Sequence, residues 1–157
     1  MLTWGEFRAT RPDLAEAGRE LIYHFGPGLG FLATVRSDGG PRLHPICPVI
    51  AGEGLYAFII PSPKLADLLR DGRYALHSES MPDNDDAFYL TGRAEPCRDA
   101  ALRKVVESVY FAGLGKDPWA GFEAEVLFEL MLDTCLLTRT PGHGGPYMHA
   151  VWKANSV

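Results

Sequence analysis

Hydrophobic and polar residues change their spacing several times along the chain, and each change predicts an element. The pattern Thr3-Trp4-Gly5-Glu6 fits a capping box that opens a short helical turn. From Pro12 to Phe25, apolar residues recur at intervals of three and four, the period of a helix with one buried face. Gly26-Pro27-Gly28 ends this helix. We therefore expect a helical segment over residues 3–25.

Beyond residue 30 the period shortens, and apolar runs bounded by glycine-rich turns predict strands. These runs cover residues 31–35, 43–50, 55–60, 74–79, 87–96 and 126–138, with a last short strand over 147–152. Pro45 and Pro48 favour an edge or a bulge for the second run, because proline cannot donate to a ladder. Helices are expected over 62–72 and 99–111. Since most links are hairpins, we expect a small antiparallel barrel carrying a few helices.

Composition narrows the class of protein. The 157 residues are 46% apolar and 22% charged, which suits one folded domain over residues 1–157. The net charge is 15 − 20 = −5, so we expect no general affinity for nucleic acid. No run approaches the roughly 20 apolar residues that span a bilayer, and the N-terminus is polar. Three cysteines without a CxxC pair fit reduced thiols. We expect a cytoplasmic protein with no membrane partner.

Two short stretches look like nucleotide- or calcium-binding motifs, but the residues and elements around them do not fit such sites. Gly28 to Ala33 spells GxGxxA, but a helix precedes it and a strand follows, the reverse of a dinucleotide site. The acidic loop Asp83 to Asp86 lacks the glycine and glutamate of a calcium loop. His44 and Cys47 point to opposite faces of a strand. We expect no metal site.

One site signal remains, at the start of the helix over 62–72. Ser62 and Lys64 stand where the first helical turn has unpaired N–H groups and a partial positive charge. Arg42, with Arg36 across its turn, adds positive charge near the strand that feeds this helix. A phosphate fits such a place. An ordinary cap followed by a solvated lysine explains the same residues.

The order of several segments resembles a known family. Five segments carry the resemblance: Gly40-Pro41-Arg42-Leu43-His44-Pro45-Ile46-Cys47-Pro48-Val49, Gly54-Leu55-Tyr56-Ala57-Phe58-Ile59, Ser62-Pro63-Lys64-Leu65-Ala66-Asp67-Leu68, Arg73-Tyr74-Ala75-Leu76-His77-Ser78 and Phe88-Tyr89-Leu90-Thr91-Gly92-Arg93-Ala94. In this order they look like the FMN-binding split barrel of the pyridoxamine 5′-phosphate oxidase-like family. The resemblance covers roughly residues 12–138. It implies a mainly β fold, a six-stranded antiparallel split barrel with helices, working as a homodimer with FMN at the interface.

The same resemblance implies the site. The cofactor-binding residues it implies are Arg42, Leu43, His44, Pro45, Ile46, Phe58, Ile59, Ser62 and Lys64, the last two holding the phosphate. Pro63 stands where the family often has arginine before the lysine. The tail lacks the family's substrate-binding Arg-x-His, so vitamin B6 oxidation is not expected. Tyr147 and Trp152 are candidates for stacking on a substrate, with burial of a C-terminal strand as the alternative.

The function expected is that of a flavin-dependent oxidoreductase acting on a small molecule, without a protein general base, since the flavin carries the hydride. Relatives on this fold use the deazaflavin F420 or bind haem. The alternatives are therefore an F420-dependent reductase, an F420- or haem-binding protein, a flavin carrier without turnover, or an empty structural homologue. The run over 55–60 has no polar face, so both its faces must be covered, by the barrel and by helices or a partner chain.

Overall fold

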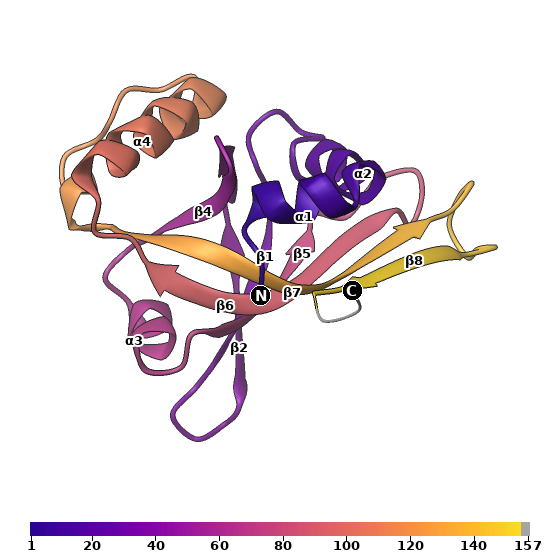
Figure 1. Ribbon diagram of the computed structural model, residues 1–157, viewed down its shortest axis with the longest axis horizontal. Coiled ribbons are helices and arrows are strands. Elements are labelled where there is room, and N and C mark those ends of the chain that lie inside the picture. The colour runs from indigo at the N-terminus through magenta and orange to yellow at the C-terminus, as the bar shows by residue number, and fades with distance from the viewer. Residues whose placement is uncertain (155–157) are drawn as a thin grey trace.

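The computed structural model describes residues 1–154 and is mainly antiparallel β sheet with four helices in that range (Figure 1). The strands are β1 Gly30–Val35, β2 Pro41–Ile46, β3 Val49–Ala51, β4 Gly54–Ile59, β5 Arg73–Ser78, β6 Ala87–Pro96, β7 Val126–Arg139 and β8 Met148–Lys153. The helices are α1 Trp4–Thr10, α2 Pro12–Ile22, α3 Pro63–Arg70 and α4 Ala100–Leu114, with a 3-10 turn η1 Phe122–Ala124. The expected split-barrel architecture is confirmed, with eight strands where the sequence predicted six in the barrel and a last short one.

The extra strand arises where the run over 43–50 breaks. The strand pairing follows the order β2-β1-β5-β6-β7-β4-β3, and β8 pairs with β7. The run therefore divides at Cys47-Pro48 into β2 and β3, which lie at the two ends of this order. As predicted from its prolines, β2 is an edge strand, and Pro45 needs no ladder donor on the outer side. The chain thus crosses from one end of the sheet to the other in two residues.

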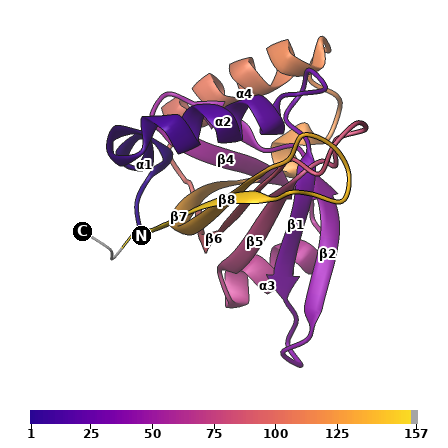
Figure 2. The same cartoon turned by 90° about the vertical axis from the view of Figure 1, so that its right-hand side faces the viewer.

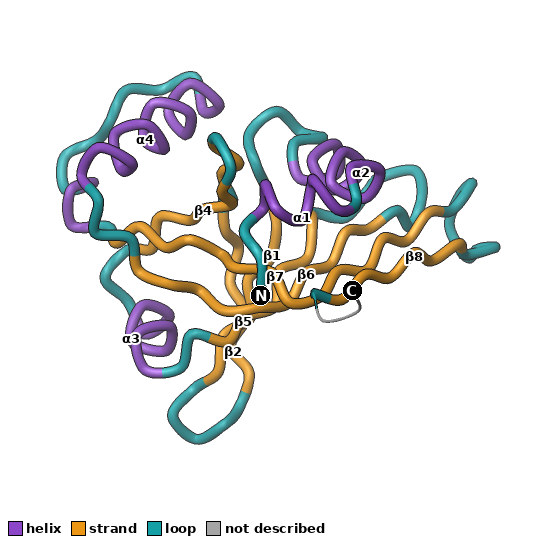
Figure 3. The backbone as a smooth tube through the Cα atoms, in the orientation of Figure 1, coloured by secondary structure: helices purple, strands orange, loops and turns teal. Residues whose placement is uncertain are grey.

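Helices cover the sheet on two sides. In both ribbon views α1, α2 and α4 lie on one side and α3 on the other (Figures 1 and 2). The capping box that opens α1 is formed, with Glu6 N donating to Thr3 Oγ1 and Thr3 N to Glu6 Oε2. Gly18 of α2 packs on Phe88 of β6 so closely that a Cβ would lie 2.5 Å from the ring. The link between β1 and β2 and the link between β7 and β8 extend away from the barrel (Figure 3).

Strand β4 is buried on both faces, as its sequence predicted. Leu55, Ala57 and Ile59 join the main core, and Tyr56 and Phe58 join a second core formed with α4. One chain thus covers both faces of this strand. The apolar pattern of residues 55–60 therefore gives no argument for a partner chain.

The face that α3 turns to the barrel differs from the one predicted. In the sequence, Leu65, Leu68 and Leu69 predict the apolar face of this helix and leave Lys64 on its polar side, but Lys64 is 9% exposed and Leu69 is 60% exposed. The buried residues of α3 are Lys64, Asp67 and Leu68, at spacings of three and four. The helix packs through a buried ionic contact, described below, which rotates Lys64 inward.

Candidate functional site

The start of α3 uses most of its own donors. Ser62 Oγ accepts from Leu65 N at 3.4 Å and donates to the carbonyl of Ile60 at 2.9 Å. Ala66 N bonds to the Ser62 carbonyl at 3.2 Å, and Pro63 has no N–H. Ser62 is therefore the helix cap, and Lys64 N is the one first-turn donor left over in the described structure. Binding of an anion at this helix start would therefore depend more on side chains, and less on backbone N–H groups, than the sequence suggested.

Arg42 is anchored to α3 by a carboxylate. Its Nε donates to Asp67 Oδ2 at 2.7 Å, while Thr34 Oγ1 donates to the same oxygen at 3.0 Å. Asp67 is buried, and burial raises its pKa, but these hydrogen bonds outweigh that effect and hold the pKa below 3.8. The sequence predicts that the run over 43–50 is the hairpin partner of the run over 55–60, which leads into α3, and on that ground it places Arg42 near α3. That reasoning is wrong, since β4 pairs with β3 and β7, and Asp67 makes the link.

Lys64 and His44 meet beside this ion pair. Lys64 forms no ion pair or hydrogen bond within residues 1–154, and burial lowers its pKa, opposed by Glu125 and Cys47. His44 Nε2 is buried with no hydrogen-bond partner among the described residues. Burial, then Lys64 and Arg42, lower the pKa of His44, which favours a neutral imidazole. An unpaired buried nitrogen costs about 1–3 kcal/mol, so the site has hydrogen-bonding capacity that the chain leaves unused.

A cavity of about 350 Å³ opens next to Lys64. Its lining comes from β1, β2, β4, α3, α4 and neighbouring loop residues: Leu29, Gly30, Pro45, Ile46, Cys47, Phe58, Ile60, Lys64, Glu79, Tyr110, Trp119 and Glu125. The volume lies within the range of small-molecule sites, about 300–1,000 Å³. Four predicted cofactor residues, Pro45, Ile46, Phe58 and Lys64, are among these. Ile59 is fully buried in the core, and Ile60 takes its place because successive strand residues face opposite sides.

The sequence missed one whole wall of the cavity. Tyr110 of α4 and Trp119 of the following loop lie against the predicted Phe58 through a cluster of aromatic rings. The ring centroids of Phe58 and Tyr110 are 5.4 Å apart, and those of Trp119 and Phe122 are 5.2 Å apart. Burial raises the pKa of Tyr110 to about 12 and also raises that of the Cys47 thiol, so both stay protonated at neutral pH. The wall is aromatic and suits a planar ring.

The other seven predicted residues do not line this cavity. Arg42, His44, Ile59 and Ser62 lie as described above, and Leu43, Tyr147 and Trp152 remain. Leu43 is 65% exposed on β2. Trp152 is buried and packs on Phe7, with ring centroids 4.8 Å apart, so the alternative of a buried C-terminal strand is the one observed. Tyr147 is exposed, and its hydroxyl donates to Asp85 at 3.0 Å. The structure therefore offers neither Tyr147 nor Trp152 a face on the cavity.

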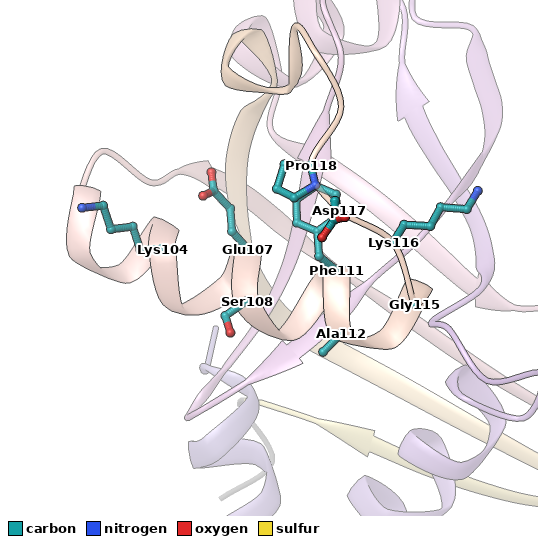
Figure 4. A pocket seen from close by; sticks show the side chains of 9 residues that line it. All are labelled: Lys104, Glu107, Ser108, Phe111, Ala112, Gly115, Lys116, Asp117 and Pro118. Atoms are coloured by element: carbon teal, nitrogen blue, oxygen red, sulfur yellow. The ribbon is translucent and has the colours of Figure 1, made fainter.

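A larger depression of about 630 Å³ lies on α4 and the loop after it (Figure 4). Its charged side chains diverge: Lys104 and Lys116 point outward at opposite ends (Figure 4). None of the predicted cofactor residues lines it. We therefore take the smaller cavity beside Lys64 as the candidate site.

Two other features were considered for the described part of the chain: a cluster of metal ligands and a helix that could cross a membrane. Among residues 1–154, no group of three or more His, Cys, Asp or Glu side chains lies close enough together to hold a metal. Within the same residues, no helix has the length and apolar character needed to cross a membrane.

Comparison with known proteins gives the class of fold. No family model matches the chain, and no curated protein is significantly similar in sequence. Solved structures do match. One is a Clostridium acetobutylicum protein related to general stress protein 26 of B. subtilis and assigned to the pyridoxinephosphate oxidase family. It is 12% identical with a TM-score of 0.65, over 92% of this chain and 96% of that one.

Two more matches widen the range of functions on this fold. An F420 reductase is 24% identical with a TM-score of 0.56, over 69% of this chain and 89% of that chain. A heme binding protein from Mycobacterium smegmatis is 17% identical with a TM-score of 0.61. The match covers 85% of this chain but only 57% of that protein's length. At these identities the likeness shows the fold alone: the chain folds as a split barrel like the matched structures.

Proposed function

We propose that this chain binds FMN in the cavity beside Lys64 and acts as a flavin-dependent oxidoreductase on a small molecule, as a homodimer. The observation that carries the proposal is the pairing of an aromatic wall with an unpaired, buried lysine at a helix start. Flavin mononucleotide offers a planar ring for the aromatic wall and a phosphate for the lysine. The orphaned nitrogen of His44 next to Lys64 supports the fit, because it has no partner in the described chain.

Each side chain then has a physical task. Lys64 holds the phosphate by a charge-assisted hydrogen bond, and Lys64 N, left free by the cap, adds a backbone donor. His44 does not line the cavity, so we take it as a polar neighbour of Lys64 and not as a ligand. Phe58, Tyr110 and Trp119 exclude water from the planar ring. When bound, the flavin supplies hydride transfer. The protein's part is therefore to bind and orient, and we assign no general base.

The test begins with the absorption spectrum of the purified protein. Bands in the near-ultraviolet and blue identify a flavin, a single violet-blue band F420, and a Soret band haem. If the protein is colourless, titration with FMN and with riboflavin follows. We expect FMN to bind more tightly, since riboflavin lacks the phosphate. Equal binding of the two, or no binding of either, contradicts the FMN site.

A second measurement separates an enzyme from a carrier. The FMN-loaded protein is mixed with NADH or NADPH, and bleaching of the flavin is followed with time. Reduction, followed by reoxidation with an added acceptor, is the result expected of an oxidoreductase. Tight FMN binding without reduction by either donor favours a non-catalytic flavin carrier. An F420 or haem spectrum moves the proposal to the alternatives that the related folds suggest.

A further inference from the structure

Glu125 is a buried carboxylate whose acceptor oxygens the fold leaves largely unused. It precedes β7, is 7% exposed and lines the candidate cavity. Among residues 1–154 it makes no ion pair, and the Trp119 indole is the one side chain that supports it through a hydrogen bond. An ionised carboxylate can accept about four hydrogen bonds. The cavity therefore offers acceptor capacity that suits a ligand with O–H or N–H donors.

The backbone of Glu125 is held from both sides. Glu125 N donates to the carbonyl of Phe122 at 3.0 Å, and Arg103 Nη1 donates to the carbonyl of Glu125 at 2.7 Å. Arg103 directs its Nε to Glu107 Oε1 at 2.6 Å, and its guanidinium lies over the ring of Phe58, 5.2 Å from the centroid. Arg103 thus fixes the place of Glu125 without pairing with its carboxylate.

Glu125 neighbours both parts of the proposed flavin site. Burial lowers the pKa of Lys64 and raises that of Glu125, and each of the two groups opposes the shift of the other. Their charges are therefore close, although they form no ion pair. The carboxyl group also receives the hydrogen bond of the Trp119 indole, which belongs to the aromatic wall. The lining thus places an acceptor beside the lysine and beside the wall.

FMN has its chemical groups in the same order. A ribityl chain, which carries hydroxyl groups, joins the phosphate to the flavin ring. With the phosphate at Lys64 and the ring on the aromatic wall, this chain is the part of the ligand that reaches Glu125. A carboxylate repels the phosphate and accepts hydrogen bonds from neutral hydroxyls. The ribityl chain therefore matches Glu125 in both place and chemistry.

We propose that Glu125 accepts hydrogen bonds from the ribityl hydroxyls of the bound flavin and is thereby a specificity-determining residue, which selects a flavin with a polyol chain over the bare ring. The inference rests on the proposed function, because FMN is what occupies the cavity. It needs no second ligand, since the phosphate, the polyol and the ring of one cofactor meet the lysine, the carboxylate and the aromatic wall.

The experiment compares three flavins that differ by one part each. Lumiflavin has the ring with a methyl group, riboflavin has the ribityl chain in its place, and FMN adds the phosphate. Fluorescence titration measures each affinity. Glu125→Met removes the acceptor and keeps the length of the side chain, so it should weaken riboflavin and FMN by the same factor, roughly 10- to 150-fold. Lumiflavin should bind unchanged. Lys64→Met, in contrast, should weaken FMN alone.

Two further variants serve as controls. Glu125→Gln keeps one acceptor oxygen, so its riboflavin affinity should lie between those of the wild type and Glu125→Met. The same variant carries the test if Glu125→Met fails to fold, because riboflavin and FMN should still weaken equally while lumiflavin does not. Glu123→Met, a matched change at an exposed position of η1, should alter none of the three affinities.

The outcomes separate this inference from the proposed function. If the wild type binds FMN and Glu125→Met weakens lumiflavin as much as riboflavin, the carboxylate acts on the ring or on the fold, and its role toward the polyol is overturned while the flavin site stands. Unchanged riboflavin affinity in Glu125→Met overturns it equally. If the wild type binds none of the three flavins, the proposed function fails and this inference fails with it.

Discussion

Arg42 Nε lies 2.7 Å from Asp67 Oδ2, and this contact joins the edge strand β2 to the inner face of α3. The Asp67 side chain is 4% exposed, whereas that of Arg42 is 30% exposed. Arg70 lies on the other carboxylate oxygen, with its Nη1 3.3 Å from Oδ1. Arg42, which the sequence offered as a cofactor-binding residue, thus holds α3 in place. Because the Nε of Arg42 donates to Asp67, a contact between its guanidinium group and a bound phosphate stays a prediction.

Removal of Arg42 should therefore weaken the fold. A hydrogen bond to a charged group contributes about 1.5–3 kcal/mol, so we expect Arg42→Ala to lower the free energy of unfolding by about that amount. Urea denaturation at neutral pH measures the loss. Arg36→Ala is the matched control, because Arg36 pairs with Asp38 at 2.8 Å on the exposed hairpin. Such surface pairs contribute about 0–1 kcal/mol. Equal losses for the two variants would contradict the anchoring role.

Lys64 gives a second prediction, on cofactor affinity. The loss of one charge-assisted hydrogen bond of about 1.5–3 kcal/mol should weaken FMN binding roughly 10- to 150-fold. Since the Lys64 stem is buried, Lys64→Met is the better test, because it keeps the packing and removes the charge. Fluorescence titration with FMN and with riboflavin measures both affinities. Riboflavin affinity should stay constant, and an equal loss for the two ligands would show that Lys64 does not bind the phosphate.

Local patterns predicted the elements well. Ser62 as the cap with Pro63 at the first helical position, the capping box at Thr3 and the burial of residues 55–59 all follow from short-range chemistry. Ile60, the last residue of the predicted run, is exposed. Each of these signals lies within a few residues of the element it defines. The sequence could therefore place them without knowledge of the fold.

Contacts between side chains that are distant in the sequence could not be predicted in the same way. Tyr110, Trp119 and Glu125 reach the cavity only because α4 and its loop fold back over β3 and β4. Nothing in the segment before β7 reveals which strand it will cover. The burial of Asp67 was equally unpredictable, since an aspartate within a helix is expected to be solvated unless a cation such as Arg42 lies beside it in the fold. The sequence predicted one strand over 43–50, because the apolar run continues through Cys47-Pro48, where the structure separates β2 from β3.

Assembly gives a third prediction. Pro45 and Ile60 line the cavity and are exposed, and Leu43, two residues before Pro45 on the same face of β2, is exposed as well. A second copy placed against β2 would close the cavity and cover these apolar side chains. We expect light scattering to give a mass about twice 17.2 kDa. Leu43→Asp should shift the protein toward monomer and weaken FMN binding.

The matched control for the assembly is Val105→Asp. Val105 is 55% exposed on α4, on the opposite side of the sheet from α3 (Figure 1). This change should leave the mass unaltered. A wild-type monomer that binds FMN tightly would exclude the shared site.

The final prediction concerns pH and the loop between β7 and β8. His143 Nδ1 lies 2.6 Å from Asp85 Oδ1, and His143 Nε2 lies 3.1 Å from the carbonyl oxygen of Pro82. Both ring nitrogens face acceptors, which only the doubly protonated imidazolium satisfies. The hydrogen bond to Asp85, then that to Pro82, raise the pKa of His143 above 6.5. Gly144 N also donates to Asp85, at 2.8 Å, so the loop is tied to the acidic segment at several points.

The sign of the pH effect follows from the raised pKa. The stabilisation of the loop by His143 is fully present below the unfolded pKa of about 6.5 and is lost as pH rises through the higher folded pKa. We expect NMR titration of the His143 ring to give a pKa above 6.5, and protection of the Gly144 amide from exchange to fall over the same pH range. Asp85→Asn keeps the shape but removes the charge, so it should lower the pKa of His143 and abolish the pH dependence. A wild-type His143 that titrates at 6.5 or below would show that the Asp85 contact does not hold the imidazolium in solution.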